Sequence, residues 1–336
     1  MTVNLCLYHQ ELGRERSGFM PRKYDYVLRL LVKKLEKLPR ETRQFLNRFI
    51  DLLYFSRTIR EKKNCKKLDS SPLFLEFEIN RSDGFTKFYS NPSTTDKLIK
   101  FALNEKRMHL EGESQKGNSK DYLRQIWDMS KLDNNSLFIL EWALQESNLK
   151  SISKYFGGKT PILHEVSVFY SPESVVGESS NWQGSQLFHM DGGGTQCVKL
   201  WLLCQEVDIE QGPTVVVSAD QSSRLAKKLK YKPGTRIEND ETLSSLEELK
   251  TFSLIGEKGT WYATDTDRSF HYGSRTTERS SRLVFMFHYV DNNSSYYMPI
   301  LSRHYKRQLK ALPSLAREIA EKNSCSFEAM KNRLLA

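Results

Sequence analysis

The 336-residue sequence contains no uninterrupted apolar run of about 18 residues, so we predict no membrane-spanning helix. Its five cysteines form no close C-x-x-C pair and no even set, which argues against a disulfide framework and favours a reducing compartment. Residues 1–16 lack the basic-then-apolar order of a secretory signal. We therefore expect a soluble, cytoplasmic protein.

The signatures of two enzyme classes are also missing. The run Gly192–Gly194 is not followed by the Gly-Lys-Ser/Thr of a phosphate-binding loop, and no helical pattern opens after it. The sequence has no Gly-x-Ser-x-Gly and no recognisable Cys/His signature. Phosphate-loop chemistry and nucleophilic catalysis therefore have little support, and the glycine run is read as a turn or as close backbone approach to a site.

Positive charge is concentrated at the start of the chain. The net charge is +10, and residues 1–70 contain 17 Lys and Arg against 8 Asp and Glu, a balance of +9 (17 − 8). Such a stretch can dock a phosphorylated or nucleic-acid partner, or it can be the solvated face of amphipathic helices. No base-stacking aromatic pattern accompanies the charge, so a nucleic-acid partner is not expected.

Helical periodicity dominates residues 1–158 and returns near the end of the chain. We predict a mostly helical N-terminal region over 1–158 that packs on the core, and a C-terminal helical extension over 293–336. One strand is expected at 73–79, and Gly157-Gly158 ends the last helix of the first region. The predicted helices are 24–38, 40–62, 95–110, 121–129 and 135–155.

Residues 159–292 have a different character, with eight short β-like runs separated by turn residues. Eight such strands indicate a mainly β core with flanking helices, in the form of a jelly roll or cupin-like double-stranded β-helix. A helix is expected near 221–229, within a charged segment over 218–250. The eight runs are about 162–170, 186–190, 197–205, 213–217, 251–255, 260–264, 269–273 and 282–290.

Two side chains of one run can bind a metal. His189 and Asp191 are two residues apart, so in an extended strand they lie on the same face. A histidine and a carboxylate side by side supply two of the three protein ligands of a non-haem Fe(II) site. His271, at the end of a later apolar run, is the candidate for the third.

An arginine follows at the start of the last strand-like run. Alternation puts Arg282 and His288 on one face, and a buried guanidinium needs an anion, for which the distal carboxylate of 2-oxoglutarate is suitable. A structural acid could instead pair with Arg282, or Arg275 or Arg279 could bind the carboxylate. His288 is either a group close to the site or a satisfied core histidine, and His164 is read as structural.

The segment over about 150–290 resembles the phytanoyl-CoA dioxygenase family of Fe(II)/2-oxoglutarate oxygenases. The resemblance rests on Ile152–Gly158, Phe188-His189-Met190-Asp191, Gln211–Val217, His271–Ser274 and the position of Arg282. The chain departs from it where Ser218–Gln221 replaces the family's Pro-Gly-Ser-His and where Gly259-Thr260 replaces its Gly-Asp. These positions are turns, so the departures weaken inference about substrate and leave the metal ligands unaffected.

The resemblance implies that His189, Asp191 and His271 bind Fe(II), that Arg282 holds 2-oxoglutarate, and that Trp201 lies near this cosubstrate. It also implies a dioxygenase that uses O2, releases succinate and CO2, and hydroxylates an unactivated C–H bond of a small or acyl-type substrate. A carboxylate at Asp191 favours hydroxylation, because related halogenases have a small residue there. The alternatives are a cupin-like metal enzyme that does not use 2-oxoglutarate, and a non-catalytic protein with a basic docking surface.

Overall fold

The computed structural model describes the β core and the helices around it. Within the described part, no helix is both long enough and apolar enough to cross a bilayer. The helices predicted at 24–38 and 40–62, the C-terminal helical extension and Gly192–Gly194 lie outside the described residues. These are 76–112, 122–131, 133–158, 161–173, 182–191, 197–232, 234–238, 242, 248–277 and 279–291.

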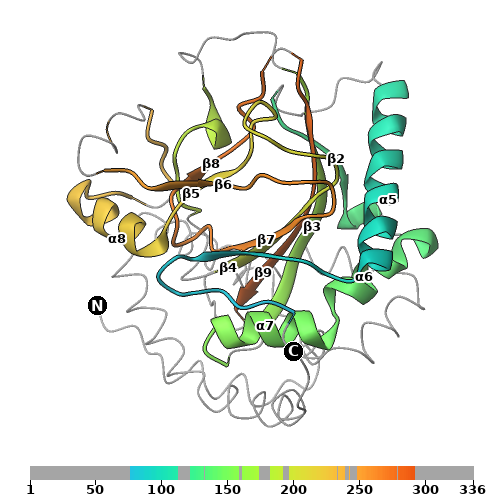
Figure 1. Ribbon diagram of the computed structural model, residues 1–336, viewed down its shortest axis with the longest axis horizontal. Helices are drawn as coiled ribbons and strands as arrows, with labels where there is room; N and C mark the ends of the chain where they lie inside the picture. The colour runs from blue at the N-terminus through green and yellow to red at the C-terminus, as the bar shows by residue number, and fades with distance from the viewer. Residues whose placement is uncertain are drawn as a thin grey trace, which may run out of the picture.

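A six-stranded antiparallel sheet is the centre of the fold (Figure 1). Its strands are hydrogen-bonded in the order β1-β7-β4-β9-β3-β2. The longest pair joins β3 to β9 over almost their whole length, with Pro161 opposite Asp291 and Ser171 opposite Arg282. The strands are β1 (Phe85–Phe88), β2 (Arg124–Asp128), β3 (Pro161–Ser171), β4 (Cys197–Leu203), β7 (Trp261–Thr264) and β9 (Arg282–Asp291).

A second, three-stranded antiparallel sheet has the order β6-β5-β8. Its strands are β5 (Val215–Val217), β6 (Thr251–Ser253) and β8 (His271–Tyr272). A separate bridge pairs His189 with His271, so the segment before β4 is attached to β8 of this sheet.

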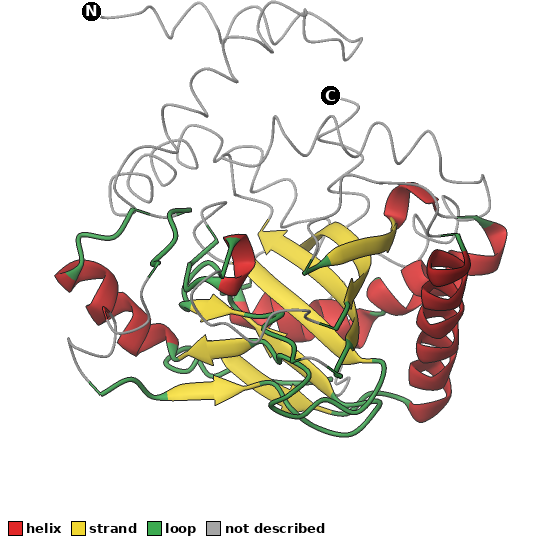
Figure 2. Cartoon of the chain, turned by 90° about the horizontal axis from the view of Figure 1, so that it is seen from above, coloured by secondary structure: helices red, strands yellow, loops and turns green. Residues whose placement is uncertain are grey.

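The helices lie at the sides of the sheets (Figures 1 and 2). Asn91 caps α5 by accepting bonds from the amides of Ser93 and Thr94, and Pro92 occupies its first turn. In both views α8 lies on the side of the molecule opposite α5. The helices are α5 (Pro92–Glu111), α6 (Leu137–Ala143), α7 (Glu146–Tyr155) and α8 (Ala219–Lys228), with 3-10 turns η1 (Met129–Lys131), η2 (Asn134–Ser136) and η4 (Gly184–Gln186).

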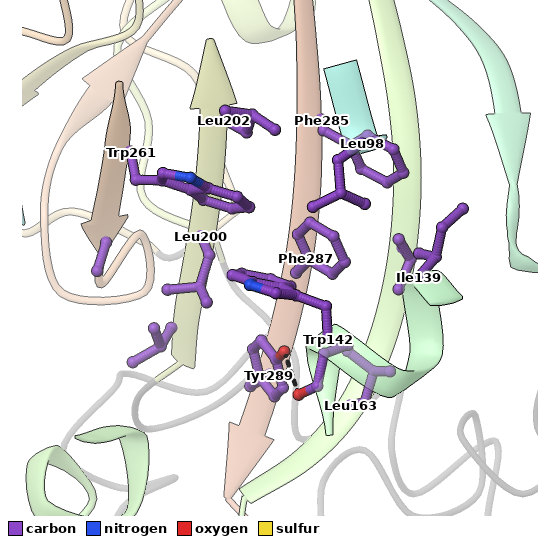
Figure 3. Close-up of a cluster of buried hydrophobic side chains, with 14 of the residues drawn as sticks. Leu98, Ile139, Trp142, Leu163, Leu200, Leu202, Trp261, Phe285, Phe287 and Tyr289 are labelled. Carbon is purple, nitrogen blue, oxygen red and sulfur yellow. Dashed lines mark hydrogen bonds between the residues drawn. The ribbon is translucent and has the colours of Figure 1, made fainter. Parts of the chain in front are cut away.

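One face of the large sheet packs against α5, α6 and α7 (Figure 3). Trp142 of α6 stacks on Trp261 of β7 with ring centroids 4.3 Å apart, and Phe287 of β9 lies 4.6 Å from Trp142. The Tyr289 hydroxyl donates to the Ala143 carbonyl at 2.8 Å. Because side chains alternate along a strand, Leu283, Phe285, Phe287 and Tyr289 of β9 enter this core, and the residues between them face the other way.

The other face of the large sheet is turned toward the small sheet. Val284 of β9 and Tyr262 of β7 share an apolar cluster with Val216 of β5, which joins the two sheets. The cross-strand register places Lys199 of β4 opposite His288 of β9, and His288 opposite Glu165 of β3. Polar side chains therefore form one row across the face that the two sheets share.

Several predicted elements are confirmed. The strands expected at 162–170, 197–205 and 282–290 are β3, β4 and β9, and the helix expected near 221–229 is α8. Gly157 and Gly158 have positive φ values of 70° and 82° after α7, as a helix-terminating pair should.

The helix predicted over 121–129 is wrong, because this segment forms β2 and pairs with β3. A bulge between Gln125 and Trp127 buries the adjacent residues Ile126 and Trp127. Two neighbouring buried residues break the alternation of a strand and imitate a helical pattern. Residues 124–128 form a strand because they pair with the long strand β3.

Two other boundaries also differ. The helix predicted over 135–155 is divided into α6 and α7 at Leu144-Gln145, and residues 77–79, within the strand predicted over 73–79, are not in a strand. Phe77 and Ile79 are nevertheless buried in the core, which accounts for the alternating pattern. The strand β1, at the edge of the large sheet beside β7, was not predicted.

Candidate metal centre and anion site

His189, Asp191 and His271 meet between the two sheets. Each offers one ligand atom, and the three atoms lie within 4.8 Å of one another. Asp191 Oδ1 is 3.7 Å from His189 Nε2, and Asp191 Oδ2 is 3.9 Å from His271 Nε2. The structure thus brings together the three residues that the sequence predicts.

Main-chain hydrogen bonds position the three residues. The His189 amide donates to the His271 carbonyl at 3.0 Å, and the His271 amide donates to the His189 carbonyl at 2.9 Å. The Asp191 amide donates to the Thr266 carbonyl at 2.9 Å. The two imidazoles are therefore a directly opposed cross-strand pair, with ring centroids 4.2 Å apart.

A main-chain carbonyl two residues earlier in the chain sets the tautomer of each imidazole. His189 Nδ1 lies 2.8 Å from the Leu187 carbonyl, and His271 Nδ1 lies 3.1 Å from the Ser269 carbonyl. A carbonyl only accepts, so Nδ1 carries the proton and Nε2 keeps its lone pair. Burial lowers the pKa of both imidazoles, so both are neutral at neutral pH.

Lys199 forms an ion pair with the third ligand. Lys199 belongs to β4 of the large sheet, and its Nζ lies 2.6 Å from Asp191 Oδ2. Burial alone would raise the pKa of Asp191, but Lys199 holds it well below the ordinary value. Asp191 is therefore ionised, and the set presents two neutral nitrogens and one carboxylate.

The chemistry of this set fits a divalent transition metal. Two imidazoles and one carboxylate from two segments match the ligands of non-haem Fe(II) sites. The hydrogen bond from each Nδ1 to a carbonyl fixes the ring, as histidines that bind metals require. Both histidines are buried, with 3% and 6% of their surface exposed, so the donors are already desolvated.

Arg282 begins β9 in a buried position, with 4% of its surface exposed. It donates to the Gly212 carbonyl at 2.7 Å and to the hydroxyls of Thr214 and Ser274 at 3.3 and 2.8 Å. All these partners are neutral, and among the described residues no carboxylate forms an ion pair with Arg282. Burial lowers the pKa of Arg282 to about 10, so it remains a cation at neutral pH.

The backbone at Gly273 comes close to this guanidinium. A Cβ at Gly273 would lie 3.5 Å from both terminal nitrogens of Arg282 and 3.2 Å from Thr214 Oγ1. Gly273 is two residues after His271 in the chain. A buried cation whose hydrogen-bond partners are all neutral is suited to bind an anion.

The alternative arginines are engaged elsewhere. Arg275 donates to the Gln186 carbonyl at 2.8 Å and stacks on Tyr272, with its guanidinium carbon 3.6 Å from the ring centroid. Arg279 is exposed. Of the three candidates, only Arg282 is a buried cation.

Trp201 lies on the same face of β4 as Lys199 and is half-buried, with the Lys199 ammonium 5.9 Å from its ring centroid. Its indole nitrogen donates to Thr264 Oγ1 at 2.9 Å. The Trp201 ring is therefore held in place on the face that the two sheets share, two residues along β4 from Lys199.

Sequence reasoning missed the polar groups that support the site. Lys199 is the single charge in the apolar run Cys197–Leu203, and that isolation could have identified it. Thr214 and Ser274 carry no comparable signal, because single hydroxyl residues in turns are common. Their role depends on the approach of β5 and β8 to the start of β9.

No protein-family model and no curated protein matches the sequence. Solved structures give distant likenesses. EctD from S. alaskensis with bound Fe has a TM-score of 0.44 at 13% identity, over 63% of this chain and 74% of that chain. AviO1 from Streptomyces viridochromogenes Tue57 has 0.43 at 12%, over 64% and 92%. The non-heme alpha ketoglutarate dependent epimerase SnoN from nogalamycin biosynthesis has 0.43 at 16%, over 63% and 80%. At these values the chain is assigned to no family.

Proposed function

We propose that the protein is an Fe(II)- and 2-oxoglutarate-dependent dioxygenase that hydroxylates an unactivated C–H bond of a small or acyl-type substrate. The observation that carries the proposal is the pairing of two sites. The structure has a set of two histidines and one aspartate, and a buried arginine with only neutral partners that bonds to Ser274, three residues after His271. The two antiparallel sheets, with the site between them, are the arrangement expected of a double-stranded β-helix.

His189, Asp191 and His271 would hold Fe(II), and this metal with 2-oxoglutarate and O2 would supply the oxidising chemistry. The chain prepares the ligands without help from the metal. The carbonyls of Leu187 and Ser269 keep the protons on Nδ1 of the two histidines. Lys199 keeps the proton off Asp191. No ligand has to be deprotonated before the metal binds.

Arg282 would bind the distal carboxylate of 2-oxoglutarate, with the hydroxyls of Thr214 and Ser274 beside it and the backbone of Gly273 close by. A bidentate arginine–carboxylate pair supplies both charge and direction. Once a divalent metal is bound, the positive charges of the metal, Lys199 and Arg282 together exceed the single negative charge of Asp191. An anionic second ligand is favoured for that reason, and Trp201 would form part of the wall of its pocket.

The test is an anaerobic titration of the metal-free protein with Fe(II) and then 2-oxoglutarate, followed by the visible charge-transfer band of the chelate. We expect a band that requires both components and is lost in His189→Ala. In Arg282→Met we expect about 100-fold more 2-oxoglutarate to be needed, because a charge-assisted pair contributes about 3 kcal/mol. The exposed Arg279→Met is the matched control and should behave as the unchanged protein does.

A band in the unchanged protein justifies a substrate screen by succinate release. Metal binding without a band at any 2-oxoglutarate concentration would contradict the proposal and favour a metal enzyme that does not use this cosubstrate. No metal binding at all would contradict both, and salt-sensitive partner binding by the basic region over 1–70 would then be the function to examine.

A further inference from the structure

A second group of metal-binding side chains lies on the face that the two sheets share. His164 and Glu165 of β3 and His288 of β9 each offer one ligand atom, and these atoms lie within 4.8 Å of one another. The rings of His164 and His288 are 4.9 Å apart between centroids and inclined at 80°. The donor set has the same composition as the first, two imidazoles and one carboxylate, but shares no residue with it.

A β-bulge brings this group together. The register of β3 on β9 runs from Leu163 opposite Tyr289 to Glu165 opposite His288, so His164 is the extra residue. In a regular strand His164 and Glu165 would point to opposite faces. The bulge changes the direction of one side chain, and as a result consecutive residues of β3 both offer donors to the same point.

Glu165 is oriented by neutral neighbours. Its Oε1 accepts from Gln125 Nε2 at 3.1 Å and from Ser167 Oγ at 2.7 Å. Among the described residues no hydrogen-bond donor reaches Oε2. One oxygen of the carboxylate is therefore fixed while the other is available, which is how supporting residues commonly orient a metal-binding carboxylate.

His288 provides the second, independent sign of a ligand. Only 7% of its surface is exposed, and within the described part of the chain its Nε2 has no hydrogen-bond partner. A buried polar atom without a partner destabilises the folded protein, because it has lost its hydrogen bonds to water. A lone pair on Nε2 that binds a metal ion removes this cost, whereas a purely structural imidazole would leave it in place.

From this geometry we propose that His164, Glu165 and His288 form a second binding site for a divalent transition-metal ion. Two nitrogens and one oxygen suit ions of the Fe(II), Co(II), Ni(II) and Zn(II) type, and do not suit Mg²⁺ or Ca²⁺, which prefer oxygen ligands. The proposal does not depend on the chemistry at the first centre.

Lys199 has a relation to both groups. It lies directly opposite His288 in the β4–β9 register while its ammonium contacts Asp191. The ion pair with Lys199 keeps the Asp191 carboxylate in the first group. The bound ion would connect β3 to β9 across the bulge.

The test uses the full chain and Co(II), with bound metal counted after equilibrium dialysis. We expect about two ions per chain in the unchanged protein, about one in Glu165→Gln or His288→Gln, and about one in the double variant His189→Gln/Asp191→Asn. His109→Gln, an imidazole of α5 outside both groups, is the control and should keep both ions. Glu165→Gln keeps the volume of the side chain and one oxygen that can accept hydrogen bonds. It should therefore fold even if the buried substitution His288→Gln prevents folding.

A second readout separates binding at this site from binding elsewhere. Co(II) should raise the Tm of His189→Gln/Asp191→Asn, and this increase should disappear when Glu165→Gln is added. The proposal would be overturned if the unchanged protein bound only one ion and His189→Gln/Asp191→Asn bound none. It would also be overturned by a second ion that survives both Glu165→Gln and His288→Gln.

Discussion

At the scale of single residues, three buried imidazoles determine how the metal-free protein responds to acid. Burial lowers the pKa of His189, His271 and His288 relative to an unfolded chain, where it is about 6.5. Below that pH the unfolded chain binds protons that the folded chain does not. The contribution of these three histidines to the free energy of unfolding is therefore constant above about pH 6.5 and decreases as the pH falls below it.

Each of these histidines should lower the free energy of unfolding by at most about 1.4 kcal/mol for each pH unit below about 6.5, until its own folded-state pKa is reached. Urea unfolding of the metal-free protein at pH 7.5 and 5.5 measures the total. His288→Gln should make the dependence on pH less steep by the contribution of one proton. An unchanged dependence in that variant would mean that the His288 ring is protonated in the folded protein.

Gly273 is the residue at which a single methyl group should affect the anion site. In Gly273→Ala the new Cβ would lie 3.2–3.5 Å from Thr214 Oγ1 and the Arg282 guanidinium. We expect the affinity for 2-oxoglutarate to fall about tenfold, a loss of about 1.4 kcal/mol, with the affinity for Fe(II) unchanged. Calorimetric titration of each component distinguishes this result from general damage, which would weaken both.

At the scale of elements, the alternation of β9 made the site predictable and two irregularities concealed the rest. Arg282, Val284, Met286 and His288 share one face because β9 is regular. The bulge in β2 made a strand look like a helix, and the bulge in β3 gave His164 a neighbour that sequence spacing does not suggest. Bulges depend on the pairing of distant strands, and periodicity within one segment does not report them.

The turn before β5 depends on one glycine. Gly212 has a φ of 62°, and a Cβ there would lie 2.4–2.6 Å from backbone atoms of Arg275 and Thr276. Gly234 has a φ of 81° with no atom within 4 Å of an added Cβ, so it is a matched control.

Gly234→Ala should lose only the cost of the left-handed conformation, about 1–2 kcal/mol. Gly212→Ala should lose at least about 1–3 kcal/mol more, because backbone atoms must move. Urea unfolding of both variants gives the difference. Equal losses would show that the contact between this turn and Arg275 is not tight.

At the scale of the whole molecule, one face of the large sheet supplies stability and the other supplies chemistry. Phe287 contacts Trp142 and Trp261 between the sheet and α6. Phe287→Ala should lower the free energy of unfolding by about 3–5 kcal/mol while leaving the metal stoichiometry of the folded protein unchanged. Leu103→Ala, at a position with 43% exposure, should change it by less than about 0.5 kcal/mol.

The division between faces also limits what sequence could predict about the site. His189 and Asp191 could be recognised because they are two residues apart, and His271 because it ends an apolar run. Lys199 and the cradle of Arg282 come from the approach of the two sheets, which no local pattern describes. The three candidate ligands could therefore be predicted from the sequence, and the groups that set their charge could not.

Two main-chain hydrogen bonds between His189 and His271 hold together the two segments that carry the candidate metal ligands. Each histidine holds the other's carbonyl through its own amide, so these two N–H groups cannot reach solvent unless the segments separate. A metal ion that joins the two rings would oppose that separation. Deuterium uptake at the two amides should therefore slow when the centre is loaded, and this would report its occupancy without any measurement of turnover.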